Sequence, residues 1–481
     1  MQHLFPAAAC VAALLITGCN SSSSNRASTA APVSSNSTGT TQSQASPPPP
    51  PPPAPVALAD PGGQVAAVGT ASPVQATVAR DAFVAFRELA STGGMELPAD
   101  PALAGLAFVV QDSGYVRVLR LDPTPSSLRE VPLPGAPFAP GVAAGALCIQ
   151  DATTAYVTAS GAGGEAVYRF DPSTASTAAD VTAYPLDALT VTWPAGVRDQ
   201  AGADVGGQAL PLTYTSDALG IGARLFVVSA NFDPQFNLNP GTLWSFQQDP
   251  LTRTLGAAQV LQTRGFNPTG VEVLQTPAGP LLLVTDTGPY GAGEGAIDVV
   301  DPVSFRTVGW IDLPGQDPLG RVRISPDGRW GYVGSQSKAA VFAVDLSGFA
   351  SLVGATAPVN LSNRFRGGYA FPPTAGGTDL ISDIAFSHSG RYLYAANFNA
   401  SKLHVIDLVQ PGLAATVDGF ARTGDPQAYE GLLNGIAVRP GVPGVDFSGP
   451  SLYALTINLA PADRRVTDVN VVLDTIEFDK H

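Results

Sequence analysis

One strand–turn–strand unit recurs along the chain and constrains its fold more than any other feature. The clearest copy, residues 321–346, reads RVRIS-PDGR-WGYVGS-QSK-AAVFAVDL: two β-rich runs joined by an Asp-Gly turn, then a third run. The same order returns at 381–408 as ISDIAFS-HSGR-YLYAAN-FNAS-KLHVIDL. Five weaker copies share the aspartate that closes the third run, which gives the series Asp122, Asp171, Asp249, Asp301, Asp345, Asp407 and Asp474.

Repeats of this size predict a solenoid, a propeller or an array. Units of four antiparallel strands favour the β-propeller, because radial packing hides the strand edges. The sequence therefore predicts an all-β fold, a seven-bladed β-propeller over residues 64–481. The last copy lacks a fourth strand before the chain ends, so we expect a strand from the N-terminal region, within 64–77, to complete it and close the ring.

Three segments carry a family resemblance: SPDGR at 325–329, FSHSGR at 386–391 and YAANFNASKLHVIDL at 394–408. They resemble the repeats of YVTN-type seven-bladed propellers and, more distantly, those of lactonase-like propellers. The resemblance implies a fold and leaves the activity open, because propellers host many unrelated functions.

The first 57 residues have the composition of a leader followed by a tether. Residues 5–16 form an apolar stretch too short to span a bilayer, which predicts a signal peptide over 1–18. The sequence ending at Cys19 resembles the bacterial lipobox, and this resemblance implies a lipid on Cys19. Asn20 after the cysteine favours the outer membrane by the enterobacterial sorting rule. The alternative is an ordinary leader that happens to contain a cysteine.

Residues 19–57 are rich in Ser, Thr and Pro and include seven consecutive prolines, Pro47–Pro53. Such a segment buries too little apolar surface to fold, and its proline run is extended and stiff. It predicts a disordered tether that holds the propeller away from a membrane in the bacterial cell envelope, facing the periplasm or the cell surface.

Charge and cysteine content exclude several functions. The net charge of −14 repels phosphate backbones, so no nucleic-acid partner is expected. The three cysteines form no CxxC or CxxCH motif, which excludes thiolate zinc sites and covalently attached haem c. Cys148 would be the only cysteine of the folded body, so no intramolecular disulfide is expected there.

Residues 231–241 suggest a cation site. Asp233, Asn237 and Asn239 alternate with other residues and offer oxygen ligands of the kind Ca²⁺ prefers, although the terminal glutamate of an EF-hand is missing. The alternative, favoured on the residues alone, is a loop in which these side chains bond their own backbone.

Four polar residues hold matching positions at the ends of second strands: Asn231, Asp286, Asn397 and Asn458. They are candidate ligand-binding residues around the top of the central channel, where lactonase-like and gluconolactonase-like propellers place metal ligands or substrate donors. The alternative is that they cap the strand ends.

Residues 360–380 read as a long connection between two blades. Arg364, Arg366 and Tyr369 belong to residue types common at interface hot spots, so they are candidate ligand-binding residues. The alternative is packing over the propeller face. His388 and His404 are the two candidate catalytic bases, and both positions look structural.

These patterns favour a lipid-anchored envelope propeller that binds or scaffolds a protein, a polysaccharide or a small ligand. The alternative is a lactonase-like or other hydrolase that uses the channel with a divalent cation. No catalytic residue can be assigned from a motif, because no GxSxG, HExxH or paired-carboxylate pattern occurs.

Overall fold

The structure is a computed structural model of the whole chain. It describes residues 56–69, 73–75, 83–84, 92–121, 126–139, 141–161, 164–233, 235, 237–249, 252, 254–374, 379–418, 430–439, 452–459 and 466–473. The predicted signal peptide, Cys19 and most of the predicted tether lie outside these residues. Within the described part the chain is almost entirely β-strand, with no α-helix and four short 3-10 helices: η2 (Pro101–Leu103), η3 (Ala178–Asp180), η4 (Phe349–Leu352) and η5 (Ser362–Arg364).

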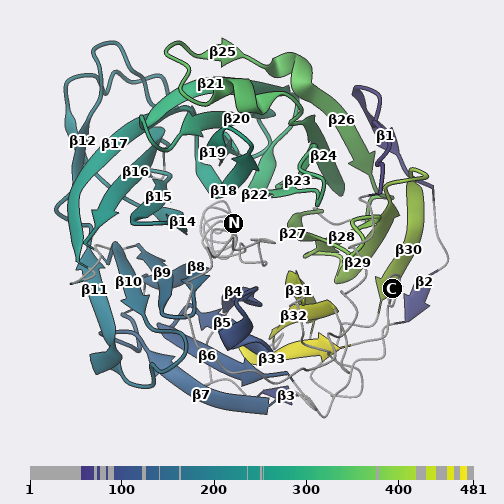
Figure 1. Cartoon of the computed structure of the whole chain (residues 1–481), viewed down its shortest axis with the longest axis horizontal. Helices are drawn as coiled ribbons and strands as arrows, with labels where there is room; N and C mark the ends of the chain where they lie inside the picture. Colours follow the sequence, from purple (N-terminus) through teal and green to yellow (C-terminus); the bar gives the residue numbers. More distant parts are fainter. Residues whose placement is uncertain are drawn as a thin grey trace, which may run out of the picture.

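The sheets stand around a common centre, as a propeller requires (Figure 1). Six of them are blades built from one stretch of sequence each. The first three are β4 (Thr92–Glu96), β5 (Leu106–Gln111), β6 (Tyr115–Arg120), β7 (Ser126–Pro132); β8 (Ala143–Asp151), β9 (Thr154–Ser160), β10 (Ala166–Phe170), β11 (Val181–Pro185); and β14 (Thr215–Ile221), β15 (Arg224–Ser229), β16 (Pro240–Gln248), β17 (Leu255–Phe266). The next three are β18 (Pro268–Thr276), β19 (Gly279–Asp286), β20 (Glu294–Asp301), β21 (Arg306–Pro314); β22 (Pro318–Ile324), β23 (Trp330–Ser335), β24 (Ala340–Asp345), β26 (Phe365–Ala370); and β27 (Ile381–Phe386), β28 (Tyr392–Asn397), β29 (Lys402–Asp407), β30 (Gly412–Asp418). The predicted all-β propeller is confirmed.

One further sheet combines the two ends of the chain. It contains β31 (Glu430–Val438), β32 (Leu452–Leu459), β33 (Val466–Leu473) and, on the outer edge of β33, β3 (Phe83–Val84). Where the sequence predicted seven blades, the last completed by an N-terminal strand, we count six continuous blades and this composite sheet. The N-terminal region does supply the outer strand of the last sheet, but the strand is β3 and not one within 64–77.

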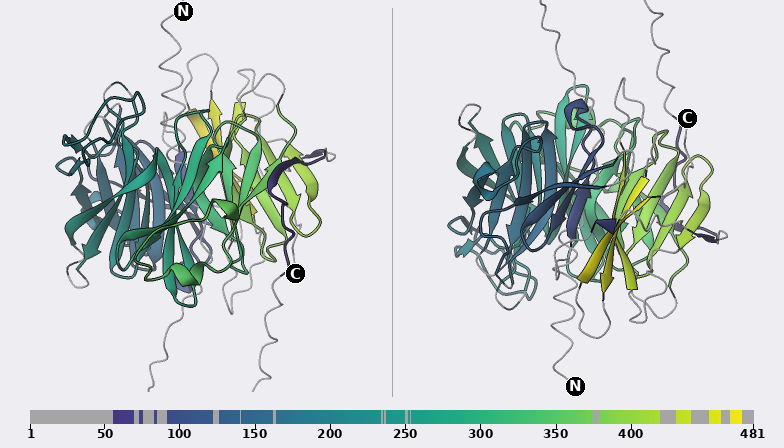
Figure 2. Two further views of the ribbon diagram at one scale, coloured as in Figure 1. Left: turned by 90° about the horizontal axis from the view of Figure 1, so that it is seen from above. Right: turned by 90° about the horizontal axis from the view of Figure 1, so that it is seen from below.

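Residues 64–67 and 73–75 instead lie on the outside of two other blades. β1 (Gln64–Ala67) pairs in parallel with β26, and β2 (Pro73–Gln75) pairs in parallel with β30. We call residues 56–84 the strap, because its described parts pass along the outer rim from one blade to the next (Figures 1 and 2). A third added strand, β25 (Val359–Asn360), pairs with β21.

The segment 360–380, predicted as a connection, holds the fourth strand of its blade. β26 pairs with β24 on one side and with β1 of the strap on the other. Two adjacent glycines, Gly367 and Gly368, make this strand hard to predict from the sequence, because glycine is uncommon within strands. A Cβ on Gly367 would lie 2.0 Å from the Gln64 carbonyl oxygen, and one on Gly368 would lie 2.0 Å from that of Val341. Glycine is required here because backbone approaches from both sides.

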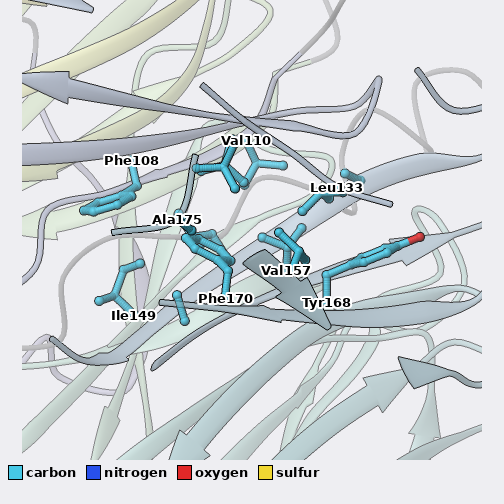
Figure 3. Close-up of a cluster of buried hydrophobic side chains, with 14 of the residues drawn as sticks. Phe108, Val110, Leu133, Ile149, Val157, Tyr168, Phe170 and Ala175 are labelled. Carbon is cyan, nitrogen blue, oxygen red and sulfur yellow. The ribbon is translucent and has the colours of Figure 1, made fainter. Parts of the chain in front are cut away.

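The core lies between successive blades. One cluster joins the first and second blades and is shown in Figure 3, with Phe108, Val110 and Leu133 from the first and Val157 and Phe170 from the second. Such clusters recur at the following junctions. Removing this apolar surface from water is the main stabilisation of a body whose one cysteine in the described residues, Cys148, forms no disulfide.

The repeated aspartate at the end of the third strand has a structural role. Its carboxylate accepts a backbone N–H two or three residues further on, as in Asp171 to Ser173, Asp301 to Val303 and Asp407 to Val409. This Asx turn reverses the chain into the fourth strand. The sequence repeat is therefore a turn signal, and the structure explains why it recurs.

Candidate functional site

The strand-end polar residues predicted to ring the channel are buried and engaged with the protein itself. The Asn231 Nδ2 donates to the Pro240 carbonyl and to Thr242 Oγ1, both at 3.0 Å, and its Oδ1 accepts from Ser229 Oγ at 2.7 Å. Its backbone has φ +54°, a conformation that asparagine tolerates better than most residues. Asn231 thus has the arrangement expected of a strand cap.

Asn397 has a comparable role in its blade. Its Nδ2 donates to Asp379 Oδ1 at 2.9 Å, and Asp379 also accepts from the backbone and hydroxyl of Thr374. Burial of Asp379 works against its charge, but these hydrogen bonds outweigh it and lower the pKa of the carboxyl. The preceding blade repeats the pattern with Asp317 and Ser335, 2.6 Å apart. Asn458 lies in β32, and its side chain is outside the described residues.

Asp286 differs from the asparagines because the charge of another acid acts on its carboxyl. Asp298 on β20 is buried beside it, and no local pattern in the sequence connects the two residues.

The loop proposed to hold calcium is closed by its own hydrogen bonds. Asp233 Oδ1 accepts from the backbone of Gln235 and Asn237, and its Oδ2 accepts from Asn237 Nδ2 at 2.9 Å. Asn239 Nδ2 donates to the Asn231 carbonyl at 3.0 Å. The arrangement is the one described by the alternative of a self-bonded Asx loop. Among the described residues, no three His, Cys, Asp or Glu side chains come together in a way that could hold a metal ion.

The candidate interface residues of 360–380 are used to hold the strap and the blade. Arg366 forms an ion pair with Asp60 of the strap at 2.6 Å, and Arg364 contacts Asp345 at 3.3 Å. Tyr369 is 2% exposed, and burial raises its pKa to about 12. These contacts match packing within the blade, and ligand binding by these residues stays a prediction.

The two candidate bases lie in different surroundings: His404 is buried and His388 is exposed. His404 is buried and stacked on Phe371 with ring centroids 4.2 Å apart, and burial lowers its pKa to about 4. His388 contacts the Arg439 carbonyl through Nε2. A histidine that stays neutral at pH 7 in a closed packing layer is poorly placed to take a proton from a substrate.

A group of buried charged residues lies on inner strands of the described blades, near the propeller axis (Figure 1), and the sequence patterns did not predict it. Arg321 on β22 reaches across the ring to Asp217 on β14, with distances of 2.6 and 2.8 Å from Nη2 and Nε. The same guanidinium contacts the carbonyls of Ala218 and Leu147, the latter one blade further on. Burial opposes the charge of Arg321, but Asp217 outweighs it and raises its pKa. The side chain of Arg321 therefore ties three blades together at the centre.

A second arginine on the same strand repeats the arrangement. Arg323 lies 3.2 Å from Asp383 and 3.7 Å from Glu272, which belong to the blades on either side of it. Burial raises the pKa of Asp383, and the charge of Arg323 opposes this rise.

A Ser-Asp pair on the inner strand joins one blade to the next. Ser216 Oγ donates to the Pro268 carbonyl and Asp217 accepts from the Val271 amide. Ser382 and Asp383 repeat these contacts on Leu433 and Ile436, with the same spacing of three residues between the two partners. In the first blade Glu96 accepts the amide of Ile149 in the second. The two pairs occur in the sequence as TSD at 215–217 and ISD at 381–383. Their role in joining neighbouring blades becomes visible only in the folded structure.

Although the connection from β24 to β26 (residues 346–364) leaves from the opposite end of the propeller, several of the longer loops lie at the end where second strands lead to third strands and one blade leads to the next. There β12 (Thr190–Thr192) and β13 (Ala209–Pro211) form a hairpin in the connection before β14, fixed by Trp193, which is 2% exposed. The β15–β16 loop carries Phe232, which meets Tyr214 edge-on at 5.0 Å. Tyr290 in the β19–β20 loop is 62% exposed. We call this end the loop face.

The chain was compared with family models, with curated proteins and with solved structures, and only solved structures are similar to it. No family model matches the chain, and no curated protein matches it. Among solved structures it is similar to the β-propeller domain of Myceliophteria thermophila Cps50 (Swd1), at 14% identity over 77% of this chain and 94% of that one, with a TM-score of 0.43. It is similar to Kuenenia stuttgartiensis hydrazine synthase at 13% identity over 82% and 98%, and to Saccharomyces cerevisiae Sqt1 at 8% over 82% and 98%, both with a TM-score of 0.46. The resemblance to YVTN-type and lactonase-like propellers stays a prediction.

Proposed function

We propose that the chain is a binding protein in which a rigid propeller presents the loop face to a protein, a polysaccharide or a small ligand. The observation that carries the proposal is the state of the ionisable groups at the axis. Asp217 and Arg321 are 0% and 3% exposed and bond each other and the backbone of neighbouring blades. Charged side chains that are buried and paired with each other stabilise the ring, which supports a scaffold role for the propeller body. Nothing in the described residues favours the hydrolase alternative.

The loop face has the chemistry of a recognition surface. Loops set on a rigid scaffold commonly carry function, and aromatic residues are enriched where proteins bind. Tyr290 stands between Gly288 and Gly291, which have φ of +78° and +70° and let the chain turn sharply around the tyrosine. Tyr214 and Phe232 add a second aromatic group on the neighbouring blade.

The proposal includes a lipid anchor on Cys19 and a place in the bacterial envelope. It is supported by the lipobox-like sequence and by the strap, which fastens the segment following the tether to the propeller rim through β1 and β2. Expression in a bacterium with an alkyne fatty acid should label the wild-type chain and leave Cys19→Ser unlabelled. Equal labelling of both chains would refute the anchor.

Site-specific photo-crosslinking tests the binding surface. Tyr290 and Val303 belong to one blade, at opposite ends of β20, and both side chains are well exposed, 62% and 75%. A photoreactive residue at 290 should give a discrete adduct in cells, and the matched control at 303 should not. Adducts of equal yield at both positions, or an adduct at 303 alone, would contradict a binding role for the loop face.

A further inference from the structure

The junction between β17 and the following blade holds two buried carboxylates side by side. β17 is the outer strand of its blade, and its end passes over β19 and β20 of the next one. The Arg264 amide donates to Asp298 Oδ2 at 2.8 Å, and the Gly265 amide donates to Asp286 Oδ2 at 3.1 Å. Two consecutive backbone groups of one blade are thus bound by two acids of its neighbour.

Asp286 and Asp298 also share one face of their sheet. Val284 is opposite Asp298 in the register of β19 and β20, so Asp286, two residues on, is the diagonal neighbour of Asp298. Such diagonal pairs lie within side-chain reach. The two residues are 0% and 1% exposed, and the Oδ1 atom of each has no hydrogen-bond partner. Two orphan oxygens on adjacent buried acids need an explanation, because leaving such atoms unpaired is costly.

Among the described residues no Arg or Lys side chain forms an ion pair with either acid, although the charge of Arg264 acts on both and opposes the rise of their pKa values. The Arg264 side chain turns to Asp312 at 3.1 Å and stacks over Trp310 at 4.7 Å. β16 has no charged residue, and β19 has none besides Asp286. On β18, Glu272 faces Arg323 and the Val273 amide. On β20, Glu294 is exposed at one end and Asp301 bonds the turn at the other. On β21, Arg306 is exposed at the end far from Asp312.

We propose that Asp286 and Asp298 hold one proton between their Oδ1 atoms, and that this shared proton forms a pH-sensitive clasp between the two blades. A proton bound by one carboxyl and accepted by the other satisfies both orphan oxygens and leaves one negative charge. Like charges in a buried site disfavour ionisation of both acids. In agreement, burial and the neighbouring carboxylate raise the pKa of Asp286, and burial raises that of Asp298 to about 7.

The sign of the pH effect follows from proton counting. Above the ordinary pKa of an aspartate, about 4, the closed junction holds a proton that the opened junction releases. Stability of the junction is therefore greatest in acid and is lost as the pH rises, until the closed form also loses its proton.

Hydrogen exchange of the β17 peptide between pH 5 and 7, corrected for intrinsic exchange rates, tests the clasp. The opening constant of wild type should rise by up to about tenfold per pH unit. In Asp298→Asn the opening constant should not change with pH, because the amide resembles the protonated acid at every pH. Glu294→Gln is the matched control, since it removes an exposed carboxylate of the same strand that does not belong to the pair and should keep the wild-type slope.

Three results would overturn the clasp. One is an Asp298→Asn protein with the wild-type slope. Another is a large thermal stabilisation of wild type by calcium at pH 7.5, reversed by EDTA and absent in Asp298→Asn, which would make the pair a cation site. If Asp298→Asn does not fold, infrared spectra of the wild type at pH 6 and 8 decide, and absence of a protonated carboxyl band at pH 6 refutes the proposal.

Discussion

Removing Asp217 should destabilise the propeller more than removing any surface ion pair. In Asp217→Ala the Arg321 guanidinium stays buried with its charge uncompensated, and the Val271 amide loses its acceptor. Breaking a buried pair from one side costs about 3–5 kcal/mol. A buried donor left unsatisfied costs about 1–3 kcal/mol, and the two overlap because the environment relaxes once. We expect a total loss of about 4 kcal/mol.

The assay is equilibrium urea unfolding followed by tryptophan fluorescence. Arg366→Ala is the matched control, because its ion pair with Asp60 is equally short, 2.6 Å, but both side chains are more than one-third exposed. Such a pair contributes about 0–1 kcal/mol. If Asp217→Ala does not fold, the double variant Asp217→Leu/Arg321→Met should, because replacing both charges by apolar groups is often neutral.

A loss in Asp217→Ala no greater than that in Arg366→Ala would refute the reasoning. It would mean that Arg321 reaches water or another partner when Asp217 is absent. The axis would then not be a closed structural element.

Three further changes test other parts of the account. Gly367→Ala should make the strap sensitive to proteolysis, because the new Cβ would lie 2.0 Å from the Gln64 carbonyl oxygen. Gly315→Ala, at φ +74° with nothing within 4 Å, should lower the free energy of unfolding by only about 1–2 kcal/mol and leave the strap in place. Equal proteolysis of the two variants would contradict this. In the wild type, the free energy of unfolding should fall by up to about 3 kcal/mol as the pH falls from 6.5 to 4, because His404 binds a proton in the unfolded chain but not in the folded one. Urea titrations of His404→Phe should lack this contribution, and an unchanged pH profile would refute the lowered pKa. Deleting residues 56–84 should lower the melting temperature by removing β1, β2 and β3, while deleting the tether ahead of them should not; equal melting temperatures would contradict the closure by β3.

The blades could be predicted from sequence because their signals are local. Each unit brings together residues close along the chain, and the turn aspartate bonds an amide two or three residues away. The strand β26 was missed for an equally physical reason. FRGGYA at 365–370 has two adjacent glycines, which normally weaken a strand, and the need for them comes from Gln64, some three hundred residues earlier.

The axis and the clasp could not be predicted because their partners are distant in sequence. Arg321 and Asp217 are 104 residues apart, and Arg264 and Asp298 are 34 apart in different blades. The alternation of charged and apolar residues in RVRIS is typical of a half-exposed strand. Only the closed ring shows that Arg321 and Arg323 form ion pairs with acidic residues of other blades near the axis.

The central claim is that the axis is structural and that the loop face binds. Photo-crosslinking at position 290 in the Asp217→Leu/Arg321→Met background tests both halves at once. The account predicts the same discrete adduct, in the same yield, as in the otherwise unaltered chain. Loss of the adduct from a double variant that still melts cooperatively would show that the charged axis takes part in binding, and would contradict the account.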